Sequence, residues 1–362
     1  MFWMMKTMSV IVTTIFLAIP LCRLSYAEAI NYNQLRLMAA KHNMTCILVF
    51  GDSSVDPGNN NYLPTPIKSN FLPYGEDFYS GHPTGRFCNG RLTTDFIAEA
   101  FGYTDLVRAF LDPAITKKDM LHGVSFASAA SGYDEFTANL SNVMSISKQL
   151  DYFRHYKTHV RNLVGTEESE EIVRNALVIL SMGTNDFLIS YYLDPTRSRQ
   201  YSIEQYQIYL ISRMKTAIKK MHSLGARKVA VIGVPPIGCM PLLRTLRHDI
   251  KCDAELNEIA FSFNSKIQRE LKTLAGPSFT SVFVDVYRII LNAAESPKRY
   301  GFTEALKGCC GSGTYEYGNT CKDLSTCSDR TKYVFWDAVH PTERMYKIIA
   351  DDVLELILSY MF

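Results

Sequence analysis

A short segment near residue 50 places a serine where nucleophilic catalysis is feasible. The sequence Phe50-Gly51-Asp52-Ser53-Ser54 ends an apolar, β-branched run that predicts a buried strand. In doubly wound sheets the ligand site lies beyond the carboxyl ends of the strands, so a hydroxyl there is well placed to react. Gly51 permits a tight turn, and the amides that follow can face a developing anion. The alternative is that Ser53 only caps the next helix.

Two later segments carry the groups that a nucleophilic serine needs. Asn185 follows another predicted strand within Gly-Thr-Asn-Asp, and its side-chain amide can donate to an oxyanion. Asp337 precedes His340 by three residues, so its carboxylate can orient the imidazole as a general base. Alone, the first segment is equally a turn and the second a surface Asp–His pair. Together with Ser53, they supply a nucleophile, a base, an orienting acid and an oxyanion donor for acyl transfer.

The surrounding sequence alternates strand and helix patterns. Short apolar runs predict strands at residues 46–50, 177–180, 228–232 and 281–284, with a weaker one at 124–126. Apolar residues at intervals of three and four predict helices at 203–224, 256–274 and 342–358, the last with Pro341 at its start. Strands separated by crossover helices imply a parallel sheet with helices on both faces.

We expect a single α/β domain, because no internal repeat or Ser/Gly/Pro-rich linker divides the chain. The chain is longer than a usual single domain, and the additional residues should lie in the long loops 56–91 and 308–332. Six aromatic side chains of the first loop either line an acyl pocket or, as we expect, make only ordinary packing contacts. They are Tyr62, Phe71, Tyr74, Phe78, Tyr79 and Phe87.

The first 27 residues have the layout of a secretory signal peptide. Lys6 precedes the apolar run 10–21, and Ser25-Tyr26-Ala27 supplies small residues for cleavage, so residues 28–362 would form the mature domain. A signal anchor is the alternative, but the run is shorter than the ~20 apolar residues that span a bilayer, and we expect no stable membrane span. We therefore expect a secreted protein, extracellular or in the cell wall.

Two further features agree with secretion. Asn43 and Asn139 each begin an N-glycosylation acceptor sequence. Of nine cysteines, Cys22 leaves with the signal, and the other eight suit an oxidising compartment: Cys46, Cys88, Cys239, Cys252, Cys309, Cys310, Cys321 and Cys327. Their pairing cannot be deduced from the sequence, and any one of them can be a buried free thiol.

Composition and motifs argue against other classes of function. A formal net charge of +2 without a basic run does not favour nucleic-acid binding. The sequence has no Gly-x-Ser-x-Gly elbow, phosphate-binding loop or His-Glu-x-x-His motif, and we expect no cofactor. His155 and His159 have the spacing of a metal pair on a helix, but without a third ligand nearby we interpret them as a solvated face rather than a metal site.

From about Cys46 to the last predicted helix, the chain resembles the plant GDSL esterase/lipases of the SGNH hydrolase superfamily. Four blocks occur in the family's order: residues 51–53, 125–132, 183–186 and 337–340. The resemblance implies a three-layer α/β/α fold with a doubly wound, flavodoxin-like parallel sheet. It also implies that Ser53 is the nucleophile, that Asp337 and His340 complete the triad, and that Asn185 and the Ser53 amide are oxyanion donors.

The second block, Ser-Phe-Ala-Ser-Ala-Ala-Ser-Gly, departs from the family pattern. The family's glycine, whose amide is a further oxyanion donor, falls on Ala130, and Gly132 lies two residues beyond, so the donor is Ala130 or Gly132. An alanine can replace that glycine only if φ is negative or the strain is tolerated. Ser54 also stands where the family name expects Leu, but that side chain is not a catalytic group in the family mechanism.

These observations predict a serine esterase/lipase that hydrolyses carboxylic esters through an acyl-enzyme, with an acyl ester or lipid as substrate. Two other functions remain open. The same residues can transfer the acyl group to a hydroxyl other than water, and a secreted binding protein can keep the fold without catalysis. No heptad or pairing segment indicates an oligomeric state.

Overall fold

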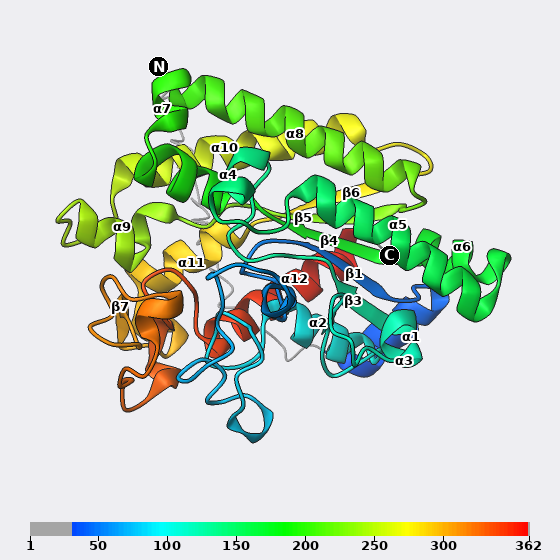
Figure 1. Ribbon diagram of the computed structural model, residues 1–362, viewed down its shortest axis with the longest axis horizontal. Helices are drawn as coiled ribbons and strands as arrows, with labels where there is room; N and C mark the ends of the chain where they lie inside the picture. Colours follow the sequence, from blue (N-terminus) through cyan, green and yellow to red (C-terminus); the bar gives the residue numbers. More distant parts are fainter. Residues whose placement is uncertain (1–30, 361–362) are drawn as a thin grey trace, which may run out of the picture. The chain divides into compact units, whose positions relative to one another are not determined.

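A six-stranded sheet, parallel at every pairing, forms the centre of the computed structural model, which describes residues 31–360 (Figure 1). The predicted signal peptide lies outside these residues. The strands are β1 (Ile47–Gly51), β2 (Arg108–Ala109), β3 (Gly123–Ser125), β4 (Leu177–Ser181), β5 (Lys228–Ile232) and β6 (Thr280–Val284). All residues of β1 and β4 are buried, as their unbroken apolar sequences predict.

The strand order is β2-β3-β1-β4-β5-β6, and this order determines where a site can form. From β1 the chain moves outward to β3 on one side, and it then returns to β4 on the other side. Strands β3, β1, β4, β5 and β6 have the flavodoxin-like order, to which β2 adds a short edge. The order reverses between β1 and β4, where doubly wound sheets bind their ligands.

Helices cover both faces of the sheet, so the described chain has three layers (Figure 1). One face carries α5 (Ile146–Val164), α8 (Ile203–Ser223) and α10 (Ala254–Leu274), which contact one another in series. The other carries α1 (Tyr32–Lys41), α2 (Thr93–Phe101) and α12 (Glu343–Tyr360). The remaining α-helices are α3 (Lys117–His122), α4 (Glu135–Leu140), α6 (Thr166–Asn175), α7 (Thr196–Gln200), α9 (Pro241–Leu246) and α11 (Val286–Glu295).

Local sequence explains where the long helices begin. The Ser202 hydroxyl accepts from the Gln205 amide, while the Gln205 side chain accepts from the Ser202 amide, so both ends of this capping box are formed before α8. Asp253 caps α10 by accepting from the amide of Leu256. The buried faces of these helices then pack on the sheet in one large hydrophobic cluster.

The five predicted strands occur within one residue of their predicted ends. Three strands were not predicted: β2, β7 (Glu304–Gly308) and β8 (Tyr333–Phe335). β2 and β8 are very short, and β7 contains charged residues, so none has the apolar run of a buried strand. β7 and β8 pair in a separate two-stranded sheet.

The prediction that Pro341 begins the last helix is wrong. α12 begins at Glu343, and Pro341 instead forms an isolated antiparallel bridge with Phe335. The Thr342 hydroxyl accepts a hydrogen bond of 3.3 Å from the Met345 amide and caps the helix. The proline therefore belongs to the turn that follows His340 rather than to the helix.

The two predicted long loops contain only short 3₁₀ turns. These are η1 (Asn59–Tyr62) and η2 (Tyr79–Gly81) in the first loop, and η6 (Gly318–Cys321) and η7 (Arg330–Lys332) in the second. Two disulfides, Cys309–Cys327 and Cys310–Cys321, cross-link the second loop. A third joins Cys239 to Cys252, whereas Cys46 and Cys88 are buried free thiols. Between residues 31 and 360, no helix combines the length and apolarity needed to cross a membrane.

Candidate active site

Ser53 lies two residues beyond β1. The turn that leads to it begins at Gly51, where only glycine fits. Gly51 has φ +152°, and a Cβ on it would lie 2.2 Å from the Ser181 carbonyl oxygen on β4. The absence of a side chain therefore lets the two strands remain paired up to the turn. The next residue, Asp52, continues this contact because its amide donates to the same Ser181 carbonyl.

A buried glutamine holds the backbone before the serine. Gln149 of α5 accepts from the Gly51 amide and donates to the Gly51 carbonyl, both at 2.9 Å. The Ser131 hydroxyl donates to the same carbonyl at 2.8 Å, and the Ser128 amide donates to it at 3.0 Å. These bonds satisfy the backbone amide and carbonyl of Gly51, the last residue of β1. Because the partners come from α5 and from the second block, the position of Ser53 is restrained on several sides.

His340 connects Ser53 to Asp337 by hydrogen bonds from its two ring nitrogens. Nε2 of His340 lies 2.8 Å from Ser53 Oγ. Nδ1 lies 2.8 Å from Oδ2 and 2.9 Å from Oδ1 of Asp337. The carboxylate therefore favours the tautomer with a proton on Nδ1, which leaves Nε2 free to accept the serine proton.

The loop after β8 brings Asp337 and His340 together through local bonds. Oδ1 of Asp337 accepts from the amides of Val339 and His340, at 2.8 and 2.7 Å, which folds the loop back on the carboxylate. The His340 carbonyl accepts from the Trp336 amide at 2.7 Å. The Phe87 ring lies beside the imidazole with 5.0 Å between centroids, so one face of the base is shielded from water.

Asn185 lies four residues beyond β4, the strand that pairs with β1, and directly precedes the π-helix η3 (Asp186–Leu193). Its amide nitrogen Nδ2 donates to the Ser131 carbonyl at 3.0 Å. Because Nδ2 carries two hydrogens, this bond orients the side chain and leaves a second donor for a ligand. Among the described residues, the backbone amides of Ser53 and Ala130 also have no acceptor.

Ala130 has the left-handed backbone conformation that the family's glycine would favour, with φ +67°. The strain is therefore tolerated at this alanine, at a cost of about 1 kcal/mol. Polar side chains from the loop after Ser53 hold the neighbouring backbone. Asp56 accepts from the Ala129 amide at 3.0 Å, and Asn60 donates to the Ala129 carbonyl at 3.1 Å. Burial raises the pKa of Asp56 to about 6.

Asp186 links the second block to the segment that carries Asn185. Its carboxylate accepts from the amides of Tyr133 and Asp134 and, at 2.6 Å, from the Thr137 hydroxyl. Burial raises the pKa of Asp186 to about 7, against the effect of these donors. A Cβ on Gly132 would lie 2.1 Å from Asp186 Oδ1, so the glycine is needed for this close approach.

A pocket opens directly at the candidate catalytic residues. Ser53, Asn185 and His340 all belong to its lining, whereas Ala130 and Gly132 do not. The rest of the lining is largely apolar, with side chains from the end of β5, from α11 and from α12. The apolar lining residues, some of which come from the segments after β4, β5 and β8, include Met182, Ile232, Pro235, Met240, Val286, Ile290, Val339 and Ile349. The arrangement thus combines a hydrogen-bonded serine with an apolar binding space.

Comparisons with known proteins show the family to which this chain belongs. Residues 47–353 match the family model described as GDSL-like lipase/acylhydrolase. A GDSL esterase/lipase of Arabidopsis thaliana is 53% identical over 337 residues, which cover 93% of this chain and 94% of the relative. Another from the same plant is 43% identical and covers 85% of this chain and 90% of the relative. The chain belongs to the GDSL-like lipase/acylhydrolase family.

Solved structures resemble the family member more distantly. An acetylxylan esterase of Geobacillus stearothermophilus, a catalytic mutant, is 11% identical with a TM-score of 0.41 and covers 86% of this chain and 94% of its own. A lipase from a goat rumen metagenome is 12% identical with a TM-score of 0.38, and covers 85% and 94%. The family match makes this protein a carboxylic ester hydrolase of the esterase/lipase type, which acts on an ester or lipid.

The structure of this hydrolase places the predicted triad residues and Asn185 together, and the predicted solvated histidines and glycosylation sites at the surface. His340 is hydrogen-bonded to both Ser53 and Asp337, and Asn185 lines the same pocket as Ser53 and His340. His155 and His159 are exposed on α5, as a solvated face requires. Asn43 and Asn139, the two predicted glycosylation sites, are also exposed.

None of the six loop aromatics lines the pocket of the hydrolase. Tyr74 and Phe87 instead pack in a separate cluster with Ala129, Trp336 and three of the loop cysteines, Cys309, Cys310 and Cys321. We call this group the satellite cluster. The aromatics therefore pack in the protein rather than line the acyl pocket, as expected, and these two rings also contact residues near His340.

Three residues that hold the site were not assigned that role in the sequence: Gln149, Asp186 and Tyr74, which was named only as an aromatic of the first loop. Asp186 adjoins Asn185, so the Gly-x-Asn-Asp pattern contained a local signal for it. Gln149 lies 98 residues from its partner Gly51, and Tyr74 lies 263 residues from its partner Asp337. No local pattern marks either of them, because each acts through a contact made only in the folded chain.

Proposed function

We propose that this protein is a secreted serine esterase/lipase that hydrolyses carboxylic esters through an acyl-enzyme on Ser53. The observation that carries the proposal is the continuous hydrogen-bonded series of three side chains. Ser53 Oγ lies 2.8 Å from His340 Nε2, and His340 Nδ1 lies 2.8 Å from Asp337 Oδ2. This order of nucleophile, base and orienting acid is that of a serine hydrolase triad.

In the first step His340 Nε2 takes the Ser53 proton while Oγ attacks the ester carbonyl carbon. The tetrahedral intermediate then collapses, the C–O bond to the alcohol breaks, and the imidazolium gives its proton to the leaving alkoxide. In the second step His340 deprotonates a water molecule that attacks the acyl-enzyme. The acid is released and the proton returns to Ser53. Asp337 remains ionised and stabilises the imidazolium.

The negative charge on the carbonyl oxygen requires donors that are already in place. The amides of Ser53 and of Ala130 or Gly132, together with Asn185 Nδ2, are the proposed set. The bond from Asn185 to the Ser131 carbonyl supports this role, because it orients the second Nδ2 hydrogen without consuming it. Between the two second-block candidates, the left-handed conformation of Ala130 favours its amide, since this is the family's glycine position.

The apolar lining suggests which part of the substrate occupies the pocket. Ile290 of α11 and Ile349 of α12 line the same pocket as Ser53, so apolar surface lies next to the reacting atom. An acyl chain gains about 0.8 kcal/mol for each methylene that it buries. We therefore assign this space to the acyl group, which favours medium or longer chains over acetyl.

Secretion is part of the proposal and rests on separate features. The predicted signal peptide ends at Ala27, before the first described helix. Three disulfides suit an oxidising compartment. Asn43 and Asn139 are exposed, so a glycan at either place would not disturb the core.

The test is hydrolysis of p-nitrophenyl acetate, butyrate, octanoate and palmitate by the purified protein and by Ser53→Ala. We expect the variant to lose nearly all activity, because the nucleophile is gone, while its circular dichroism and melting temperature stay unchanged. Ser265→Ala is the matched control. That hydroxyl donates to the Phe261 carbonyl within α10, outside the pocket lining, so its loss should leave the rate unchanged.

Equal rates in the parent and in Ser53→Ala would contradict the proposed nucleophile. Transfer to another acceptor uses the same residues, and it is measured by adding glycerol as a polyol acceptor and identifying the products. If acylated glycerol predominates over free acid, the protein is a transferase rather than a hydrolase.

A further inference from the structure

Tyr74 places its hydroxyl against the triad carboxylate. Its Oη donates to Asp337 Oδ2 at 2.7 Å, the same oxygen that lies 2.8 Å from His340 Nδ1. The side chain is fully buried and comes from the loop between β1 and α2. Within residues 31–360, Tyr74 and His340 are the side chains that hydrogen-bond this carboxylate, since its other donors are backbone amides.

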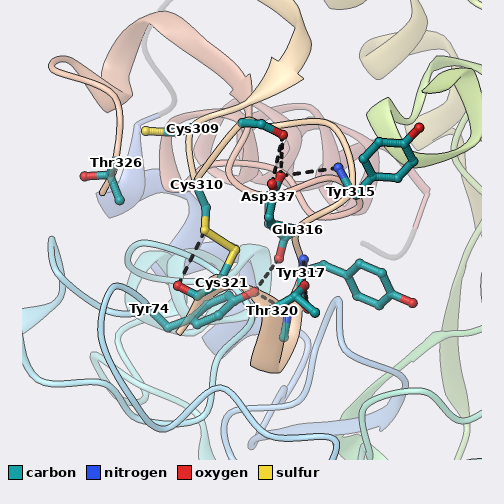
Figure 2. The surroundings of a disulfide bond; sticks show 12 residues. Tyr74, Cys309, Cys310, Tyr315, Glu316, Tyr317, Thr320, Cys321, Thr326 and Asp337 are labelled. Atoms are coloured by element: carbon teal, nitrogen blue, oxygen red, sulfur yellow. Dashed lines mark hydrogen bonds between the residues drawn. A yellow bond between two sulfur atoms is a disulfide. The ribbon is translucent and has the colours of Figure 1, made fainter. Parts of the chain in front are cut away.

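The disulfide-linked loop holds the other side of the same hydroxyl. The amide of Gly318 donates to Tyr74 Oη at 2.7 Å. Gly318 opens η6, which ends at Cys321, and Cys321 is cross-linked to Cys310 (Figure 2). Figure 2 shows Tyr74 close to this disulfide and the loop beside Asp337. A hydrogen-bonded path therefore runs from the loop amide through the phenol to the carboxylate.

Packing limits where the ring can go. Tyr74 makes edge contacts with Trp336, Phe87 and Phe71, with centroid distances of 6.2, 5.7 and 5.8 Å. Trp336 is the residue before Asp337, and Phe87 lies beside the His340 ring. The phenol thus cannot swing away without disturbing the satellite cluster. Burial, followed by the charge of Asp337, raises the pKa of Tyr74 well above its ordinary value, so the hydroxyl remains a donor.

We propose that Tyr74 is a positioning residue of the triad, which holds the Asp337 carboxylate and is itself held by the amide of Gly318 in the loop closed by the Cys310–Cys321 disulfide. The inference rests on the proposed function and deepens it, because it adds a contact that sets the geometry and basicity of the Asp–His pair. A buried carboxylate with one donor fewer is less well fixed, and it attracts the imidazolium more strongly.

The sign of the pH effect follows from that charge. Without the phenol, the Asp337 carboxylate is less stabilised by donors, so protonated His340 is favoured and the acid limb of kcat moves to higher pH. The other titratable groups that face this pair are Asp52, Cys88, Tyr317 and Tyr346. Burial is the largest cause of a raised pKa in all four, so the thiol and both phenols remain uncharged.

The first experiment measures kcat, KM and the pH profile of Tyr74→Phe on p-nitrophenyl butyrate. We expect kcat to fall about tenfold to a hundredfold, KM to change little, and the acid limb to move to higher pH. Tyr156→Phe is the matched control. It removes another buried hydroxyl, which donates to the Met120 carbonyl in the main core, and it should leave kcat and the limb unchanged. An unshifted limb with unchanged kcat in Tyr74→Phe would overturn the proposal.

A second readout does not require turnover, and it separates this inference from the proposed function. The ionisation of the His340 imidazole is followed by NMR in the Ser53→Ala background, with and without Tyr74→Phe. The proposal predicts a higher His340 pKa without the phenol, whether or not the parent hydrolyses any tested ester. An identical titration in the two proteins rejects the role of Tyr74 even if the esterase assay succeeds.

A double-mutant cycle tests the disulfide-linked side of the path. Cys310→Ser with Cys321→Ser should lower kcat, and Tyr74→Phe should then cost a smaller factor than it does in the parent. This non-additivity follows because a loosened Gly318 no longer holds the phenol. If Tyr74→Phe costs the same factor in both backgrounds, the loop does not position Tyr74 and that part of the proposal fails.

Discussion

The nucleophile and its base lie on two regions that are stabilised in different ways. Ser53 follows β1, which has paired strands on both sides and is clamped at Gly51 by Gln149. Asp337 and His340 follow β8, a three-residue strand in a two-stranded sheet. Trp336, which follows that strand, belongs to the satellite cluster, and two disulfides cross-link the long loop between β7 and β8.

The difference shows two ways to hold a catalytic side chain in position, one in a large sheet and one in a long loop. In the sheet region, many backbone bonds and a continuous apolar core restrain Ser53, so the loss of one contact is shared by its neighbours. In the loop region, fewer elements pack together, and covalent links reduce the freedom of the unfolded loop. The geometry of Asp337 and His340 should therefore depend on cysteine oxidation far more than that of Ser53.

Among the changes that test this comparison, the largest effect is expected on the sheet side of the pocket. Asn185→Ala removes one proposed oxyanion donor and should lower kcat by about 10²-fold to 10³-fold. The fold should persist, because β4 and its pairing do not depend on this side chain. Single-turnover kinetics with p-nitrophenyl butyrate, beside a melting curve, measure both quantities. An unchanged rate would remove Asn185 from the set of donors.

A smaller effect, on stability, compares the two regions directly. Cys309→Ser with Cys327→Ser opens a loop with a sequence separation of 18, and it should lower the free energy of unfolding by about 3 kcal/mol. We also expect kcat to fall, because this disulfide belongs to the satellite cluster behind Asp337. Urea unfolding and ester hydrolysis measure the two quantities.

The matched variant is Cys239→Ser with Cys252→Ser, whose sequence separation is 13. Removing this disulfide should raise the entropy of the unfolded chain by a similar amount. The satellite cluster stays intact, however, so kcat should fall less. Equal losses of kcat in the two double variants would contradict the special dependence of the acid–base region on its disulfides.

The smallest effect concerns the strain in the second block. Ala130→Gly relieves a left-handed alanine but increases the entropy of the unfolded chain, so the net gain in unfolding free energy should be 0 to about 1 kcal/mol. The ester hydrolysis rate should persist, because the amide stays in place. Thermal and urea unfolding measure the difference. A marked destabilisation would show that the methyl group of Ala130 packs more favourably than its backbone is strained.

Local sequence patterns were sufficient to predict those features of this protein that depend on residues close together in the chain. Apolar runs and helical spacing predicted the central strands and long helices, because burial on both faces or on one face leaves a periodic pattern. The strand-end positions of Ser53 and Asn185 predicted that they meet at one edge of the sheet, and β1 and β4 are indeed neighbours. Asp337 and His340 were accessible because they are three residues apart.

Tertiary structure alone decided which partners hold those groups. Tyr74 reaches Asp337 across 263 residues and Gln149 reaches Gly51 across 98, and neither contact has a periodic or local signature. The pairing of six cysteines and the isolation of Cys46 and Cys88 depend likewise on which loops meet. The physical reason is that hydrogen-bond and disulfide geometry extends over a few ångströms in space, whereas sequence patterns report only neighbours along the chain.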